Sequence, residues 1–233
     1  MPEITIIITA YKDRGWIEEA IASAKNQTFK DYDIMFASDG NPWIENYANE
    51  NNIPFYLFRK SNYSSLVNHA VLEAKGKWIK VLHDDDILEL TCLEDLYNAR
   101  GSADLVYGNA VIFNGDDKEH REIYRPPDKV TLRNLLPITV CPVNFEAELF
   151  RKEAFTDIGG FDINLGYSED YDLLINFLVN GYKIQYCDKE VVWYRHHERQ
   201  ISGNEPDMKR REQDYLQSKY IEQIVKLINW ADK

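Results

Sequence analysis

Short β-branched runs alternate with helical stripes through the first half of the chain. Residues 4–9 are β-branched throughout, which is typical of a strand covered on both faces. Apolar residues then recur at helical spacing over 16–24. Further strands are predicted at 32–37, 53–58, 78–82 and 105–107, with helices opening at Pro42 and spanning 66–74. Strands separated by helices indicate an α/β fold with a mostly parallel, doubly wound central sheet flanked by helices.

Polar residues follow three of these predicted strands where each strand ends. The first leads into Thr9, Ala10 and Tyr11, the second into Asp39, and the fourth into an aspartate triplet at 84–86. Because open α/β sheets bind ligands at the carboxyl ends of their strands, we expect these groups to share one site.

The aspartate triplet carries the strongest chemical signal. At ~5 Å and an effective dielectric of ~20, each pair of like charges costs roughly 3 kcal/mol. A divalent cation, Mn²⁺ or Mg²⁺, removes that cost and prefers oxygen ligands. A solvated acidic turn is the alternative, but a position after a buried strand favours a metal–phosphate site.

The other two strand ends have ordinary explanations when taken alone. Asp39 precedes a glycine, which is typical of a turn, and Tyr11 could be a half-exposed aromatic. Beside a metal site, Asp39 and Tyr11 can also be interpreted as contacts for a nucleotide base. A carboxylate can accept an N–H from a pyrimidine, and a tyrosine can stack on it. Together these groups indicate a nucleotide pocket.

The charge balance narrows the partners. The 233 residues include 39 acidic and 27 basic ones, a formal charge of −12, which argues against a nucleic-acid partner. The three cysteines are odd in number and scattered, so neither a disulfide framework nor a zinc cluster is indicated. The opening apolar run is too short for a signal sequence, and no stretch approaches the ~18 apolar residues of a membrane span. We therefore expect a cytoplasmic protein without a transmembrane segment.

The second half holds a glycine turn and a pair of carboxylates. Gly160, in the turn 159–162, lets a backbone approach a sugar closely. Glu169 and Asp170 precede an apolar helix, whose dipole stabilises negative charge by ~0.3–1 kcal/mol and is sufficient to explain them. Residues 114–145 show no regular pattern, and their aromatic and proline content suits a lid over an acceptor. These residues are Tyr124, Pro126, Pro127, Pro137, Pro142 and Phe145.

An apolar helical stripe closes the chain. It comprises Leu216, Tyr220, Ile221, Ile224, Val225 and Ile228. Such a stripe usually packs on its own domain. A homodimer contact or a peripheral membrane contact is the alternative, although the mixed charges do not form the basic face of a lipid-binding helix. We divide the chain into 1–205, with a half at 1–113 that carries the nucleotide pocket and a half at 114–205 that carries the carboxylate pair, and a helical extension at 206–233.

Six segments in succession resemble the family 2 glycosyltransferases of GT-A fold. They are Ile-Ile-Thr-Ala-Tyr (7–11), Gln-Thr-Phe-Lys-Asp-Tyr-Asp-Ile (27–34), Ser-Asp-Gly-Asn (38–41), Gly-Lys-Trp-Ile-Lys-Val-Leu-His-Asp-Asp-Asp-Ile-Leu (76–88), Gly-Gly-Phe-Asp (159–162) and Ser-Glu-Asp-Tyr-Asp-Leu (168–173). Their order and spacing carry the resemblance, which covers residues 4 to about 200. It implies transfer of a sugar from a nucleotide-sugar, usually a UDP-sugar, with a divalent metal and inversion at the anomeric carbon. The acceptor would be a glycan, free, lipid-linked or protein-linked.

The resemblance also assigns roles to individual residues. The nucleotide-binding set is Thr9, Ala10, Tyr11, Asp39, Asn68, Asp84 and Asp85. Asp86 is the expected metal ligand, and His197 would complete the metal or diphosphate shell. Asp170 matches the catalytic base of inverting members. Glu169 would orient the acceptor or the base, and Gly160 would lie on the acceptor side. The half at 1–113 would then be the nucleotide-binding half and 114–205 the acceptor-side half.

Departures from the family pattern leave some assignments open. His83 stands where many relatives carry aspartate, so the register of the ribose-binding carboxylate is open by one residue. Val67 stands where a basic residue often approaches the pyrophosphate; Arg59, Lys60 or the metal could cover that charge. Arg195 and Arg199 could contact phosphate. The Gln-x-x-Arg-Trp signature of processive members is missing, which favours addition of a single sugar.

Two other functions compete with a transferase. A nucleotidyltransferase would need a glycine-rich, basic loop after the first strand, but residues 10–15 contain one glycine. A silent nucleotide- or sugar-binding module would not need a general base, which argues against it because Asp170 is present.

Overall fold

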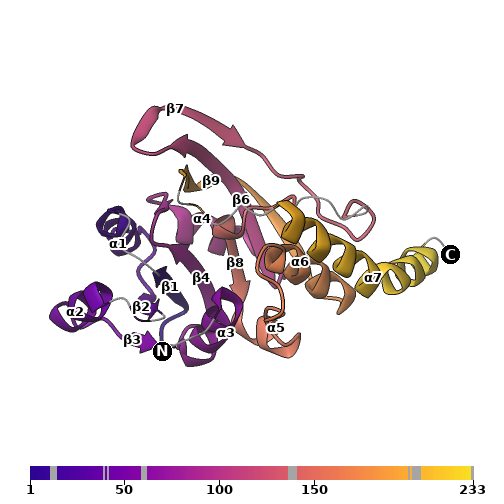
Figure 1. Ribbon diagram of the computed structural model, residues 1–233, viewed down its shortest axis with the longest axis horizontal. Coiled ribbons are helices and arrows are strands. Elements are labelled where there is room, and N and C mark those ends of the chain that lie inside the picture. Colours follow the sequence, from indigo (N-terminus) through magenta and orange to yellow (C-terminus); the bar gives the residue numbers. More distant parts are fainter. Residues whose placement is uncertain are drawn as a thin grey trace.

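The computed structural model describes residues 1–10, 15–38, 40, 42–58, 62–135, 141–198, 200 and 206–231. Within these ranges helices flank a central sheet, as the sequence predicts (Figure 1). The strands are β1 (Ile4–Ala10), β2 (Tyr32–Ser38), β3 (Phe55–Leu57), β4 (Trp78–His83), β5 (Ile87–Leu88), β6 (Leu105–Asn114), β7 (Asp117–Tyr124), β8 (Glu148–Arg151) and β9 (Ile184–His196). The helices are α1 (Ile17–Lys25), α2 (Pro42–Glu50), α3 (Tyr63–Glu73), α4 (Cys92–Ala99), a 3-10 turn η1 (Phe145–Ala147), α5 (Lys152–Asp157), α6 (Glu169–Val179) and α7 (Pro206–Ala231).

The sheet is parallel in its first half and mixed in its second. Neighbouring strands follow the order β3-β2-β1-β4-β8-β6-β9-β5, and β7 pairs with β6. The pairs among β3, β2, β1 and β4 are all parallel, as predicted. In the second half only β6 and β9 run parallel, because β8 is inserted antiparallel between β4 and β6. The predicted doubly wound pattern therefore describes the first half.

The register of β1 brings the predicted strand ends together. Thr9 is paired with His83 at the end of β4, and Ala10 with Ser38 at the end of β2. The three loops that follow these strands therefore start from one edge of the sheet.

Alternate residues of β1 enter two separate hydrophobic cores. Ile6 and Ile8 pack with the buried faces of α1, α2 and α4. Ile7 points to the other face of the sheet and packs with α3, α5 and α6. Because every β1 residue is buried, a β-branched run without polar alternation is what this strand requires.

Helix α7 belongs to the second of these cores. Leu216, Tyr220 and Ile224 are buried there, which confirms the predicted packing on the chain's own domain. The helix begins at Pro206, ten residues before the predicted stripe, and lies beside α6 (Figure 1). Val225 is exposed, and the side chain of Ile228 lies outside the described residues. The homodimer contact stays a prediction.

The region 114–145 contains more order than its sequence suggests. Its first part is β7, a charged strand that forms a hairpin with the end of β6 and reaches away from the body of the molecule (Figure 1). Pro137 lies outside the described residues. Among those that are described, no helix combines the length and apolar character needed to cross a bilayer.

Candidate active site

A cavity of about 850 Å³ opens at the carboxyl ends of β1 and β4. Its wall is shared by the aspartate loop, α3, β6, β7, the segment around η1, the start of α6, the end of β9 and the first turns of α7. The predicted site residues on this wall are Thr9, Ala10, Asp84, Asp85, Glu169 and Asp170. Two distant parts of the sequence, the aspartate pair Asp84 and Asp85 and the carboxylate pair Glu169 and Asp170, therefore face one cavity.

Asp86 turns away from this cavity into the protein. Its carboxylate is 1% exposed, and its Oδ1 accepts the backbone N–H of Arg195 at 2.8 Å. Burial, followed by the nearby carboxylates of Glu146 and Asp85, raises the pKa of Asp86 well above its usual value. Asp86 therefore joins the loop to β9.

Asp85, rather than Asp86, is the partner of His197. Asp85 Oδ2 lies 2.9 Å from His197 Nε2, and both side chains are largely buried. The predicted pairing of Asp86 with His197 is thus shifted by one residue along the loop. Two ligands bound at ~2.1 Å to one cation, at right angles, lie about 3 Å apart. The Asp85 and His197 atoms have that separation and fit a divalent cation.

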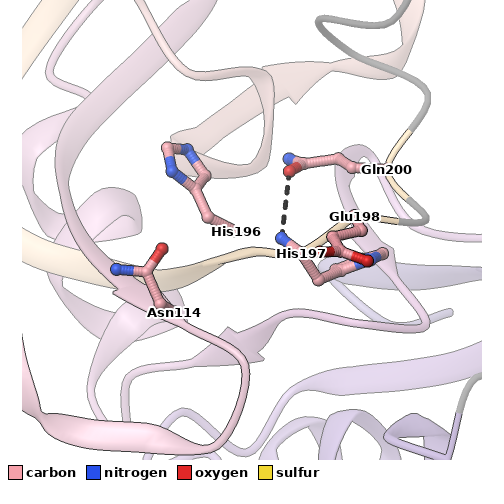
Figure 2. Close-up of a pocket in the computed structure, with 5 residues that line it drawn as sticks. All are labelled: Asn114, His196, His197, Glu198 and Gln200. Carbon is pink, nitrogen blue, oxygen red and sulfur yellow. Dashed lines mark hydrogen bonds between the residues drawn. The ribbon is translucent and has the colours of Figure 1, made fainter.

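The end of β9 places the two histidines differently. Figure 2 shows His196 and His197 pointing in different directions from the strand end, and the backbone N–H of His197 donating to Gln200 Oε1 at 3.3 Å. These residues, with Asn114 and Glu198, line a second hollow of about 460 Å³. His196 and Gln200 also line the larger cavity, so the two hollows are neighbours.

Arg195 does not present its charge for a phosphate, contrary to the sequence-based interpretation. Its side chain is fully buried, and its guanidinium bonds Glu19 at 2.5 Å, Asp116 at 3.3 Å and the carbonyl of Gly115. Its Nε donates to the carbonyl oxygen of Asp85 at 2.7 Å. Because its charge is paired within the protein, Arg195 has a structural role, and it fixes the backbone of the aspartate loop at Asp85.

His83 carries its own carboxylate partner in the cavity wall. Its Nδ1 lies 2.7 Å from Glu146 Oε1, and its Nε2 lies 2.7 Å from the hydroxyl of Tyr63. Burial opposes a charge on the ring, but the Glu146 carboxylate outweighs it and raises the pKa of His83 to about 10. The His83 ring is therefore protonated, and it is fixed by its contacts with Glu146 and Tyr63.

His83, Asp86 and Glu146 form a second group that could hold a metal. Their ligand atoms lie within 4.8 Å of one another. A protonated imidazole has no lone pair to offer, however, and its pairing with Glu146 already satisfies both groups. Asp86, the expected metal ligand, thus belongs to one candidate metal group, and Asp85 with His197 forms another beside the cavity, so the assignment of the ligand stays a prediction.

Glu169 and Asp170 open helix α6 at the cavity wall. Burial raises the pKa of Asp170 to about 6, although the backbone N–H of Tyr171, donated to its Oδ1 at 2.7 Å, acts in the opposite direction. Burial and the charge of Asp170 raise the pKa of Glu169 to about 7. A carboxylate whose pKa lies close to neutral can both take and return a proton, as a general base must.

Asn68 and Gly160 contact each other and are not among the residues that line the cavity. The Asn68 amide bonds the backbone N–H of Phe161 at 2.8 Å and its carbonyl oxygen at 2.9 Å. A Cβ added to Gly160, whose φ is +70°, would lie 2.5 Å from Asn68 Oδ1. The two residues that the resemblance assigns to nucleotide and acceptor thus form a joint that holds the loop before α6.

Some predicted residues cannot be placed, and others were missed. Tyr11, Asp39, Arg59, Lys60 and Arg199 lie outside the described residues. The cavity wall also includes Glu146, Lys209 and Gln213, which the sequence did not suggest. Extending the stripe of Leu216 and Tyr220 backwards by helical steps would have found the last two. Nothing near Glu146 in the sequence signals that it meets His83.

The profile of "Glycosyl transferase family 2" matches residues 5–159. The chain belongs to this family. An uncharacterized glycosyltransferase of Rickettsia typhi is 29% identical over 82% of the chain and 63% of its own length. The Escherichia coli enzyme WfaP, a UDP-Glc:α-D-GlcNAc-diphosphoundecaprenol β-1,3-glucosyltransferase, is 24% identical over 94% of the chain and 87% of its own length.

Among solved structures, S. aureus TarS 1-349 in complex with UDP-GlcNAc has a TM-score of 0.65 at 18% identity, over 85% of this chain and 59% of that one. This likeness shows that the chain shares its fold with TarS, which confirms the predicted GT-A architecture. The chain spans between about a third and just under two thirds of the Rickettsia relatives it matches.

Proposed function

We propose that this family 2 member transfers a single sugar from a UDP-sugar to a hydroxyl of a glycan acceptor, with metal assistance and inversion at the anomeric carbon. The acceptor glycan is free, lipid-linked or protein-linked. The observation that carries the proposal is that Asp85, which pairs with His197 at a separation compatible with a shared cation, lines the same cavity as Asp170, a carboxylate with a pKa near neutrality.

The donor end of the cavity lies at the strand ends. Thr9 and Ala10 form part of its wall, and Asp84 stands between them and Asp85. A cation bound by Asp85 and His197 would offset the negative charge that develops on the leaving diphosphate. Structures of TarS with UDP and with UDP-GlcNAc, and the UDP-Glc donor in the name of WfaP, favour a UDP-sugar.

The acceptor end is defined by the start of α6. Asp170 would take the proton from the attacking hydroxyl as it bonds the anomeric carbon from the face opposite the nucleotide. Since the sugar moves in one displacement, its configuration inverts and no covalent intermediate with the protein forms. Glu169, directly before the base, would orient the hydroxyl.

Calorimetric titration with UDP, GDP and dTDP, each in Mn²⁺ and in EDTA, tests the donor half of this proposal. We expect UDP to bind in Mn²⁺ and to lose most of its affinity in EDTA. Binding of none of the three diphosphates in Mn²⁺ would overturn it. Preference for GDP or dTDP would retain the transferase and replace the donor.

A further inference from the structure

Helix α7 is fixed to the loop that leads into α6. Glu212, which is 9% exposed, accepts the backbone N–H of Gly166 and of Tyr167, both at 2.9 Å, through its two carboxylate oxygens. About two turns further on, the helix is bonded again at Asp172, to which Lys219 and Tyr220 donate at 2.8 and 2.7 Å. The start of α7 is therefore a fixed part of the wall beside Glu169 and Asp170.

Lys209 and Gln213 lie four residues apart on this helix, so they share one face, and both line the cavity. Lys209 also lies three residues before Glu212, one turn away, so the contact that docks Glu212 onto the loop places Lys209 at the cavity. Lys209 is close enough to Asp170 for its charge to act on that carboxylate. It stands at the acceptor end.

The charge of Lys209 contrasts with the rest of the wall. The other cationic groups on the described wall are taken: Arg195 pairs with Glu19 and Asp116, and His83 pairs with Glu146. Within the same part of the structure, Lys209 makes no ion pair or hydrogen bond. Most of the charged side chains on this wall are carboxylates, which repel an anion. The ammonium group of Lys209 would therefore attract a negatively charged group of a ligand to this part of the wall.

We propose that Lys209 binds a phosphate group of the acceptor, so that the acceptor is a sugar joined to phosphate. This inference rests on the proposed transferase function and adds the chemical class of its acceptor. We do not assign the donor's diphosphate to Lys209. In the proposed function that diphosphate is bound at the strand ends, by a cation held between Asp85 and His197. A sugar ring would then lie against Asp170, with its phosphate at α7.

The test uses the full chain loaded with Mn²⁺ and saturating UDP, so that the donor side is occupied. N-acetylglucosamine 1-phosphate and glucose 1-phosphate are titrated as phosphate probes, with the corresponding methyl glycosides as uncharged controls. We expect the sugar phosphates to bind better than the glycosides. Lys209→Gln should weaken the sugar phosphates by roughly ten- to a hundredfold, the range for a hydrogen bond to a charged group. It should leave the glycosides and UDP unchanged.

The matched control is Lys226→Gln, which makes the same change in charge on the same helix at an exposed lysine paired only with Glu222. It should change none of the affinities. Equal binding of sugar phosphates and glycosides to the wild type would overturn the proposal. So would a Lys209→Gln variant that weakens UDP instead, or one that shifts the pH–rate profile of Asp170 and leaves phosphate binding intact. Failure of UDP itself to bind would instead count against the proposed function.

Discussion

Arg195 is bonded to Asp86 through its backbone, with its N–H donated to the carboxylate Oδ1 at 2.8 Å. The side chain of the same arginine reaches the preceding residue of the loop, where its Nε donates to the carbonyl oxygen of Asp85 at 2.7 Å. One residue of β9 therefore fixes the orientation of two consecutive aspartates, the first toward the cavity and the second toward the interior.

This arrangement predicts different outcomes for neighbouring substitutions. Asp85→Asn should weaken Mn²⁺-dependent UDP binding by at least roughly tenfold, since even outer-shell partners of a metal are worth that much. Asp86→Asn should keep this binding, because an amide oxygen can still accept the Arg195 N–H. Calorimetry of both variants with UDP, in Mn²⁺ and in EDTA, makes the comparison. Loss of metal-dependent binding in Asp86→Asn alone would restore Asp86 as the ligand.

Replacing Arg195 by lysine should destabilise the protein while retaining the charge. A single ammonium cannot bond Glu19, Gly115 and Asp85 at once, so buried groups lose their partner. We expect the free energy of unfolding to fall by about 3 kcal/mol. Urea denaturation measures it. Arg125→Lys, at an exposed pair 3.8 Å from Glu190, is the control and should change stability by less than ~0.5 kcal/mol. Equal effects would refute the role of Arg195.

The raised pKa of Asp170 predicts an acidic limit to the transfer rate. The base must be ionised, and burial favours its neutral form, so activity is present above the folded-state pKa of about 6 and is lost as the pH falls through it. At pH 5 we expect kcat/KM to be roughly tenfold below its plateau. A profile that stays flat down to pH 5 would show that Asp170 is not the base.

Asp170→Asn should separate chemistry from binding. Removal of a general base typically lowers the rate by ~10²–10⁴-fold, whereas the donor contacts at the strand ends are left in place. Single-turnover transfer assays and UDP titration of the same preparation provide the two measurements. A variant that transfers at the wild-type rate would point to a silent binding role for this carboxylate. One that no longer binds UDP would place Asp170 at the donor.

Two adjacent glycines offer a matched test of the joint with Asn68. Gly159 and Gly160 both have positive φ, at +89° and +70°, so alanine strains the backbone at either position by ~1–2 kcal/mol. Only at Gly160 does the new Cβ also meet Asn68 Oδ1, at 2.5 Å. We therefore expect Gly160→Ala to lower the free energy of unfolding by at least ~1 kcal/mol more than Gly159→Ala. Equal decreases in the free energy of unfolding of the two variants, measured by urea denaturation, would show that Asn68 moves aside for the new Cβ at little cost.

The first half of the fold follows from local pattern, and the second half does not. Residues 4–9 are read correctly as a strand because burial on both faces demands an unbroken β-branched run. β8 escapes such a reading, since its four residues are shorter than any periodic signal and it is defined by its neighbours β4 and β6. Lys80 is a further example, because its side chain is buried inside a strand. Its Nζ donates hydrogen bonds to the backbone carbonyl oxygens of Glu146 and Glu148.

The candidate site shows the same division at finer scale. The sequence locates the aspartate triplet at a strand end, but the choice between Asp85 and Asp86 depends on one residue of register, which reverses the direction of a side chain. That register is set by Arg195, more than 100 residues away in the chain. The pairing of His83 with Glu146 likewise arises only when β8 docks against β4.

The bond between Asn68 and Phe161 spans 93 residues, and this separation bears on the order of folding. Closing so long a loop costs chain entropy before any contact within it is gained, so we expect the segment before α6 to settle only after α3 is already in place. A chain emerging from the ribosome would then acquire its strand-end carboxylates first and its base-bearing helix last. Until that final step, an incomplete molecule would lack the means to activate an acceptor.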